Sequence, residues 1–214
     1  MEKKTDFKSL SAKAKIEYIW DYYRWHIIIT VGVIIAVIST IHYYAAYQEN
    51  VMNIVIVNAA DPQQEAALGL DEFYELSGLN PADGEIYIDT SLVYSLDADD
   101  AMYYYNEQTL LVRFAAGDMD VFIAPQQVFE RYADNGYLAD LSTLLSEEDV
   151  AKYADLFAYG TDLDTNTSIP CGIILEDNSW LTENHYYDGT CCIGITANTE
   201  SPELALEFLQ YIME

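Results

Sequence analysis

Hydrophobic residues follow different spacings along this chain, and each spacing predicts a different kind of element. Residues 27–41 are apolar almost without interruption. Counted between aromatic flanks, residues 25–47, the segment has 23 residues. A helix of that length is about 34 Å long and spans the hydrocarbon core of a membrane with some tilt. The pattern therefore predicts a transmembrane helix over residues 25–47.

Residues 11–23 have a helical spacing that places Ile16, Ile19, Trp20 and Tyr23 on one face. We expect this helix to lie along the membrane surface before the chain turns to cross it. Aromatic residues flank the apolar segment as in the interfacial belts of membrane proteins: Trp20, Tyr23 and Trp25 precede or begin it, and Tyr43, Tyr44 and Tyr47 end it. These residues predict the membrane interface.

Positive charge is concentrated before the apolar segment. Six of the nine Lys and Arg residues precede it, and only Arg113, Arg131 and Lys152 follow it. By the positive-inside rule, the N-terminus is cytoplasmic and the chain after about residue 48 is extracellular. A cleaved signal peptide is the alternative, although Tyr43 and Tyr44 lie where cleavage after an alanine requires a small side chain.

After residue 48 the pattern alternates between strand and helix. Strands are predicted at residues 52–58, 85–90, 120–124, 169–175 and 191–196, and helices at 62–77, 98–116, 125–135 and 202–213, with one or two short helices within 141–157. In the helix at 98–116 we expect Met102, Tyr105, Leu110 and Val112 to be buried. This alternation predicts an α/β domain around a mostly parallel or mixed sheet.

Acidic residues dominate the predicted outer domain, which at 167 residues is long enough for one sizeable core. After residue 24 the chain has 32 acids and three bases, a net charge of −29. Such a surface repels nucleic acid and anionic lipid, and it favours cationic ligands or basic protein surfaces. A nucleic-acid partner is therefore excluded.

Two groups of residues are candidates for metal or redox chemistry. Asp162, Asp164 and Asn166 have the spacing of calcium ligands, but the turn glycine and the final glutamate of such a loop are absent, so a polar turn is the simpler interpretation. Three cysteines, Cys171, Cys191 and Cys192, leave two alternatives open, one disulfide or reduced buried thiols. We predict no cofactor.

No catalytic motif accompanies the one histidine of the outer domain, His185, so no enzyme is predicted. Aromatic side chains are the candidates for binding, because tyrosine and tryptophan stack on sugar rings and anchor protein interfaces. The predicted ligand or partner surface comprises Tyr103, Tyr104, Trp180, Tyr186 and Tyr187. The last three lie in a segment without a clear period, where we expect them to be exposed.

Two parts of the chain resemble the extracellular solute-binding proteins of transport systems. Residues 116–124 (AGDMDVFIA) resemble the GxxDV strand of these proteins. Residues 128–141 (VFERYADNGYLADL) resemble the helix and the YAxxGxLxDL segment that follow that strand. Residues 195–209 (ITANTESPELALEFL) resemble their I-x-x-N-S-x-x-P-E-x-A-x-x-F-L ending. The resemblance implies a periplasmic-binding-protein-like α/β fold that holds a solute between two lobes. Only 18 residues, 174–191, remain for the second lobe. We therefore expect one main lobe and a truncated second lobe.

Together these features predict a single-pass cell-membrane protein with a cytoplasmic segment (1–24), a transmembrane helix (25–47) and an extracellular α/β domain (48–214). The expected function is noncovalent binding of a small solute or oligosaccharide by a protein anchored in membrane lipid. The first alternative is an interaction or assembly module that binds a membrane or envelope protein and holds no small ligand. The second is an exported carbohydrate-active hydrolase.

Overall fold

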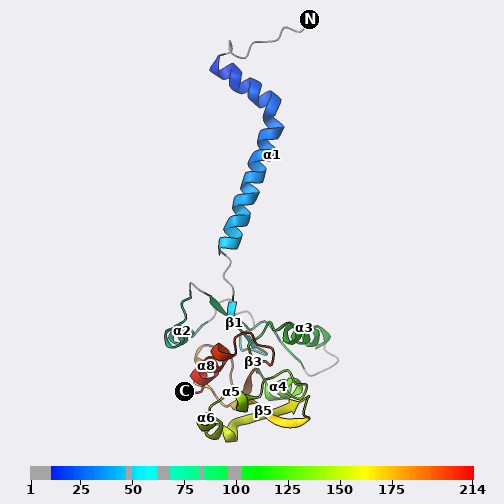
Figure 1. Cartoon of the computed structure of the whole chain (residues 1–214), viewed down its shortest axis with the longest axis vertical. Helices are drawn as coiled ribbons and strands as arrows, with labels where there is room; N and C mark the ends of the chain where they lie inside the picture. The colour runs from blue at the N-terminus through cyan, green and yellow to red at the C-terminus, as the bar shows by residue number, and fades with distance from the viewer. Residues whose placement is uncertain (1–10, 47–49, 62–67, 82–83, 96–102) are drawn as a thin grey trace. The chain divides into compact units, whose positions relative to one another are not determined.

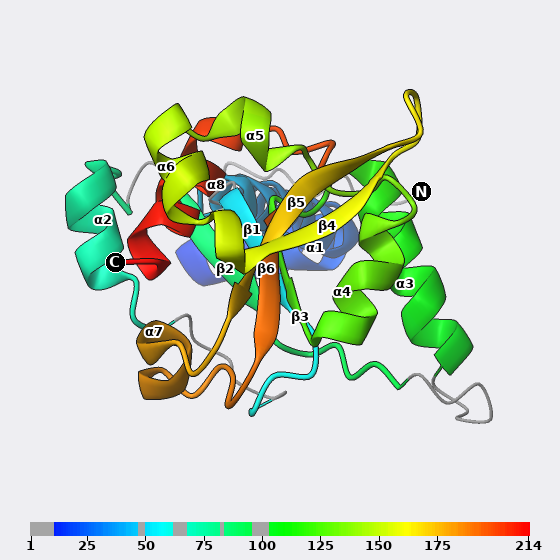
Figure 2. The same cartoon turned by 90° about the horizontal axis from the view of Figure 1, so that it is seen from below.

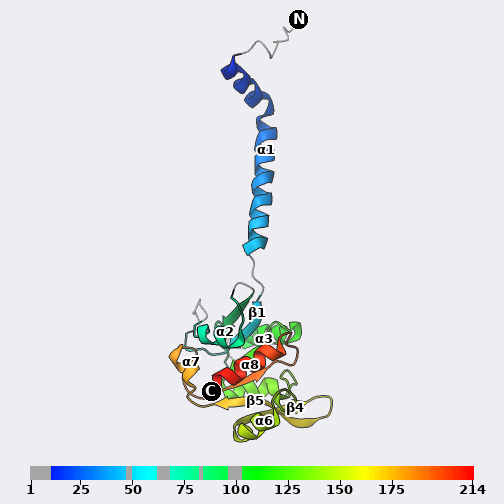
Figure 3. The same ribbon diagram turned by 60° about the vertical axis from the view of Figure 1, so that its left-hand side comes forward.

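A computed structural model gives the fold and describes residues 11–46, 50–61, 68–81, 84–95 and 103–214. The chain divides into two compact units, Met1–Gln48 and Glu49–Glu214 (Figure 1). The first unit is built on one helix, α1 (Ala12–Ala46), which bends in its N-terminal third (Figures 1 and 3). The helix predicted at residues 11–23 is present as the first part of α1 and continues without a break into the apolar segment.

Within the part of the chain that the structure describes, one segment is long and apolar enough to cross a membrane, Trp20–His42. A membrane span and an N-terminal signal sequence share these properties. Trp20, Tyr23 and Trp25 are exposed on α1. Tyr43 and Tyr44 belong to its last turn, and the prediction for Tyr47 lies outside the described residues.

The second unit contains a mixed six-stranded sheet. Its strands are β1 (Asn50–Ile56), β2 (Glu85–Asp89), β3 (Val121–Ala124), β4 (Phe157–Asp162), β5 (Thr167–Leu175) and β6 (Cys191–Ile195), in the spatial order β2-β1-β3-β6-β5-β4. Strand β1 pairs in parallel with β2 and β3, and the remaining neighbours are antiparallel. The predicted α/β class with a mixed sheet is confirmed. Strand β4 was not predicted.

Helices cover both faces of this sheet (Figure 2). They are α2 (Asp71–Ser77), α3 (Tyr103–Ala116), α4 (Gln126–Ala133), α5 (Leu141–Leu144), α6 (Glu147–Lys152), the 3-10 turn η2 (Ala154–Leu156), α7 (Ser179–Glu183) and α8 (Pro202–Ile212). On one face Phe73 of α2 and Phe208 of α8 pack against strand residues such as Ile54. On the other face Phe114 of α3 and Phe129 of α4 pack against the core. The alternating strand residues thus form two hydrophobic cores.

Helix α3 buries a different face from the predicted one. Asn106, Leu110 and Phe114 are buried at intervals of four residues, whereas Tyr105 and Val112 are 62% and 66% exposed. The Asn106 side-chain amide donates a hydrogen bond to the Val93 carbonyl oxygen, which makes burial of a polar residue tolerable. The expected burial of Tyr105 and Val112 is therefore wrong, whereas that of Leu110 is confirmed. The prediction for Met102 lies outside the described residues.

Candidate functional site

The connections around β1 create a topological switch point. Strand β1 leads through α2 to β2 on one side, and β2 leads through α3 to β3 on the other side of β1. Helix α2, which follows β1, and helix α4, which follows β3, belong to the cores on opposite faces of the sheet. The chain therefore leaves the carboxyl ends of β1 and β3 in opposite directions. In open α/β sheets a ligand-binding crevice forms at this position.

A cavity of about 330 Å³ lies at these strand ends, and we call it the switch-point crevice. It is lined by Asn58, Tyr94, Pro125, Gln126, Gln127, Val128 and Thr190. Asn58 follows β1, Pro125 directly follows β3, and Thr190 directly precedes β6. Three adjacent strands therefore supply its walls.

Asn58 shapes one wall of the switch-point crevice. Its φ of 57° is left-handed, a conformation that asparagine adopts more easily than most residues. Its side-chain Nδ2 donates to the Tyr94 carbonyl oxygen at 2.9 Å, and the Tyr94 N–H donates to Asn58 Oδ1 at 2.6 Å. The Asn58 N–H also donates to the Leu92 carbonyl oxygen at 2.9 Å. These bonds hold the segment after β2 against the end of β1.

The start of α4 forms the opposite wall. Pro125 is its N-cap and supplies no side-chain hydrogen bond. The first N–H groups of any helix lack intrahelical acceptors, so the turn beginning at Gln126 and Gln127 presents donors near the crevice. The Gln126 Nε2 donates to Glu130 Oε1 at 2.8 Å. Among the described residues that line the crevice none is formally charged, so these residues offer neutral hydrogen-bonding groups.

A polar network lies behind Tyr94. The Tyr94 hydroxyl donates to the Glu107 carboxylate, which also accepts from Arg131 at 3.2 Å, and the Arg131 guanidinium lies 5.8 Å from the centre of the Tyr103 ring. Burial and the neighbouring Glu107 raise the pKa of Tyr94 well above its usual value. Tyr94 therefore stays neutral and acts as a fixed wall.

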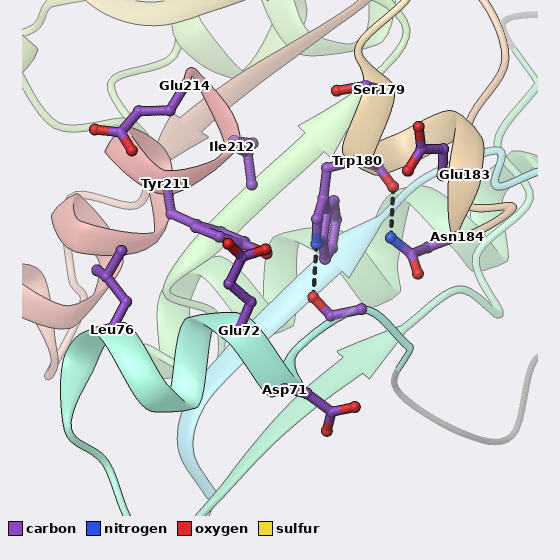
Figure 4. A pocket seen from close by; sticks show the side chains of 11 residues that line it. Asp71, Glu72, Leu76, Ser179, Trp180, Glu183, Asn184, Tyr211, Ile212 and Glu214 are labelled. Carbon is purple, nitrogen blue, oxygen red and sulfur yellow. Dashed lines mark hydrogen bonds between the residues drawn. The ribbon is translucent and has the colours of Figure 1, made fainter.

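A second concavity, the acidic cleft, is shown in Figure 4. Its volume is about 420 Å³, and its lining residues come from α2, α7, the end of α8 and the segments beside them: Gly69, Asp71, Glu72, Leu76, Ser179, Trp180, Glu183, Asn184, Tyr211, Ile212 and Glu214. The indole Nε1 of Trp180 donates to the Gly69 carbonyl oxygen at 2.8 Å. Burial and the adjacent Glu72 carboxylate raise the pKa of Tyr211. The cleft combines carboxylates with an aromatic wall, and none of its described lining residues is basic.

The structure separates the predicted aromatic surface into two regions. Tyr103 and Tyr104 are on α3, the first half-buried and the second exposed. The expected exposure of Trp180 and Tyr186 is wrong, because both are buried and their rings stack at 5.0 Å. Residues 179–183 form α7, which packs these rings into the core. Tyr187 is partly buried against the same core.

Asn58, Tyr94, Gln127 and Thr190 were not predicted as site residues. These residues are identified by their position rather than by composition, since Asn58 ends a predicted strand, Pro125 directly follows one and Thr190 directly precedes one. Extending the prediction of parallel strands to the residues at their carboxyl ends would have identified part of the crevice.

Asp162 is the last residue of β4, and Asp164 and Asn166 lie in the turn between β4 and β5. The Asp162 carboxylate accepts from the Asp164 N–H at 2.8 Å and from Thr165 Oγ1 at 2.7 Å. The hydrogen bond from Thr165 lowers the pKa of Asp162, and Asn166 has a φ of 53°. Among the described residues no group of three His, Cys, Asp or Glu is arranged to hold a metal ion. The geometry is that of a polar turn.

The three cysteines are buried free thiols. Cys171 and Cys192 belong to the core under α3 and α4, and Cys191 belongs to the core on the other face. Burial raises the pKa of each thiol to about 12. Of the two alternatives from the sequence, the structure has the reduced, buried thiols.

The fold and the crevice define an α/β domain with a mixed sheet and a switch-point cavity, preceded by one apolar helix. Comparisons of the chain with models of protein families, with curated proteins and with solved structures found no match.

Proposed function

We propose that this chain is a membrane-anchored extracytoplasmic binding protein that captures an uncharged, hydroxyl-rich solute in the switch-point crevice. One observation carries the proposal: a cavity lies at the carboxyl ends of β1 and β3, where the chain turns toward opposite faces of the sheet. The resemblance to solute-binding proteins in residues 116–141 and 195–209 supports the same function.

The chemistry of the lining selects the class of ligand. Amide and hydroxyl groups from Asn58, Gln127 and Thr190 accompany the neutral Tyr94, so a ligand with several hydroxyl groups finds both donors and acceptors. The net charge of −29 after residue 24 disfavours an anion. A saccharide fits both conditions.

A single-lobed form of the binding-protein fold accounts for the second unit. Between β5 and β6 the chain forms only the five-residue helix α7 and its flanking turns. A second lobe of the size found in two-lobed binding proteins would need its own core, which so short a segment cannot build. The ligand would therefore bind at an open crevice, with α1 anchoring the domain on the outer side of the membrane.

The acidic cleft favours a second candidate function, the binding of an organic cation. Figure 4 shows Glu72 beside Tyr211, with Trp180 forming a wall of the same cleft. An ammonium group placed over an aromatic face is attracted by the ring quadrupole, and nearby carboxylates add to that attraction.

Thermal denaturation of the full chain in zwitterionic nanodiscs tests the proposal against neutral saccharides and organic amines. At 100 times its Kd a ligand adds about 2.7 kcal/mol of stability, which raises the melting temperature by several degrees. We expect a shift with saccharides that Gln127→Ala and Thr190→Ala abolish. The control Thr143→Ala changes an exposed threonine of α5 and keeps the shift.

The other results are also informative. A rise in melting temperature with amines alone, lost in Glu72→Gln and retained in Gln127→Ala, would assign ligand binding to the acidic cleft instead of the switch-point crevice. A cooperative transition that no small ligand moves would refute solute capture and support the protein-interaction alternative.

A further inference from the structure

Helix α3 directs both of its charged side chains toward the rest of the fold. Arg113 Nη1 lies 2.6 Å from Asp89 Oδ2, and Glu107 pairs with Arg131 of α4. Six uncharged residues remain exposed on the outer side of α3: Tyr104, Tyr105, Gln108, Val112, Ala115 and Ala116. We call them the α3 face. Figure 2 shows α3 at the outer edge of the helical layer, beyond α4.

An exposed helix face in so acidic a domain would be expected to carry charged side chains, and the α3 face carries none. Tyr104, Tyr105 and Val112 are each more than 60% exposed. A cavity of about 410 Å³ adjoins them, with Val93, Tyr105 and Thr109 among its lining residues. Contiguous exposed apolar residues of this kind mark interaction surfaces.

We propose that the α3 face binds the α3 face of a second copy of this chain, with the two helices antiparallel about a two-fold axis. The six residues are symmetric about position 110, and the helical period places Tyr104 and Ala115 along one edge of the face and Tyr105 and Ala116 along the other. An antiparallel pair therefore places Tyr104 beside Ala115 and Tyr105 beside Ala116 of the second copy. Each large ring meets a small side chain, and the two middle residues meet each other. Such self-complementarity is what an isologous two-fold contact requires.

The distribution of charge favours a second copy over a basic partner. Two domains with a charge of −29 repel wherever their acidic surfaces meet. The α3 face brings no carboxylate to the contact, so two copies can approach there. A basic protein would instead bind a surface that carries carboxylates.

The contact is small and therefore weak. The 14 residues of α3 extend over about 21 Å, and the area that one helix pair buries is well below the roughly 1,600 Å² of a standard stable interface. Anchoring both copies in one membrane raises their effective concentration and compensates for the small area. The dimer belongs to the membrane-bound chain, and it is independent of the ligand of the switch-point crevice.

Cysteine cross-linking of the full chain in proteoliposomes tests the proposal. Gln108 lies close to the two-fold axis, so Gln108→Cys should form a disulfide dimer on mild oxidation. Its yield should exceed by roughly tenfold that of Ser142→Cys, an exposed position on α5. The native thiols are buried and contribute little background.

A second substitution distinguishes this contact from random collisions. Val112→Glu in the Gln108→Cys background places a carboxylate of each copy near the axis and should return the yield to that of the control. Tyr159→Glu, at an exposed residue of β4, should leave the yield unchanged. Because Val112 is exposed, thermal denaturation should confirm that the variant is folded. Mixing Val112→Glu with Val112→Lys chains should restore cross-linking.

Three results would overturn the proposal. One is a yield for Gln108→Cys no higher than for Ser142→Cys. Another is a dimer that persists in Val112→Glu, which would place the contact elsewhere. The third is quenching of a fluorophore at Gln108→Cys by spin-labelled lipid, which would assign the α3 face to the membrane surface.

Discussion

Asp89 is a buried carboxylate whose charge is stabilised by its neighbours. Burial alone would raise its pKa, but hydrogen bonds from Ser91 and the Arg113 guanidinium outweigh burial and hold the pKa below its usual value. The folded chain therefore binds this proton less readily than the unfolded chain. The resulting stability is present above the unfolded pKa and is lost as the pH falls through the lowered folded pKa.

Replacing the partner of Asp89 tests this interaction. Arg113→Met should destabilise the domain by about 2 kcal/mol at neutral pH, because it leaves a buried carboxylate without its charged donor. It should also move the loss of stability on acidification to higher pH. Urea denaturation at several pH values measures both effects. Arg131→Met removes a more exposed pair, since the side chain of Arg131 is 41% exposed and that of Arg113 is 26% exposed. It should lower the free energy of unfolding by less than Arg113→Met does. An equal loss would contradict this account.

The three thiols provide a second test at single residues. Their pKa values of about 12 keep them protonated near neutral pH, and burial keeps reagents away. We expect negligible labelling by a maleimide in the native chain and reaction of all three thiols in denaturant without a reductant. Two thiols missing after denaturation would reveal a disulfide.

Helix α4 approaches the sheet at three glycines, Gly160 of β4, Gly172 of β5 and Gly194 of β6, and the last two face the Phe129 ring. A Cβ atom at Gly172 of β5 would lie 2.3 Å from the Phe129 ring, and one at Gly194 of β6 would lie 2.8 Å from it. The ring therefore occupies the space that side chains would take. The absence of side chains at these positions allows α4 to pack closely over β5 and β6.

Gly172→Ala should destabilise the domain by about 1–3 kcal/mol through overpacking. Phe129→Leu in the same chain should recover part of that loss, because it shortens the side chain that the new methyl group meets. A double-mutant cycle by urea denaturation measures the coupling. Additive effects of the two substitutions would show that the strain lies elsewhere.

At the scale of the whole molecule, the positive-inside rule predicts a cytoplasmic N-terminus from the charge on either side of the apolar helix. In intact cells an impermeant thiol reagent should label Glu200→Cys and should label Lys13→Cys only after permeabilisation, since both positions are exposed. The full-length chain should remain in carbonate-washed membranes. Labelling with the opposite preference would reverse the orientation, and release of a shortened chain would identify a signal peptide.

Local periodicity was sufficient for most elements. Strands β1, β2, β3, β5 and β6 and helix α8 were predicted within a few residues, because each has a run of apolar residues at its own period. Strand β4 lacks such a run: it contains Gly160, and it is ordered by pairing with β5. Helix α7 has five residues, too few for a period, so the burial of Trp180 and Tyr186 was missed.

Hydropathy, charge and the type of most elements were determined by the sequence, because they depend on residues that are consecutive or a few positions apart. The apolar helix, the acidic composition of the chain after it and the α/β class belong to this group. The switch-point crevice and the α3 face depended on tertiary structure. Asn58, Pro125 and Thr190 meet only because of the order of strands in the sheet. The outer side of α3 is free of charge only because Arg113 and Glu107 pair with residues on other elements, and no local pattern encodes such long-range partners.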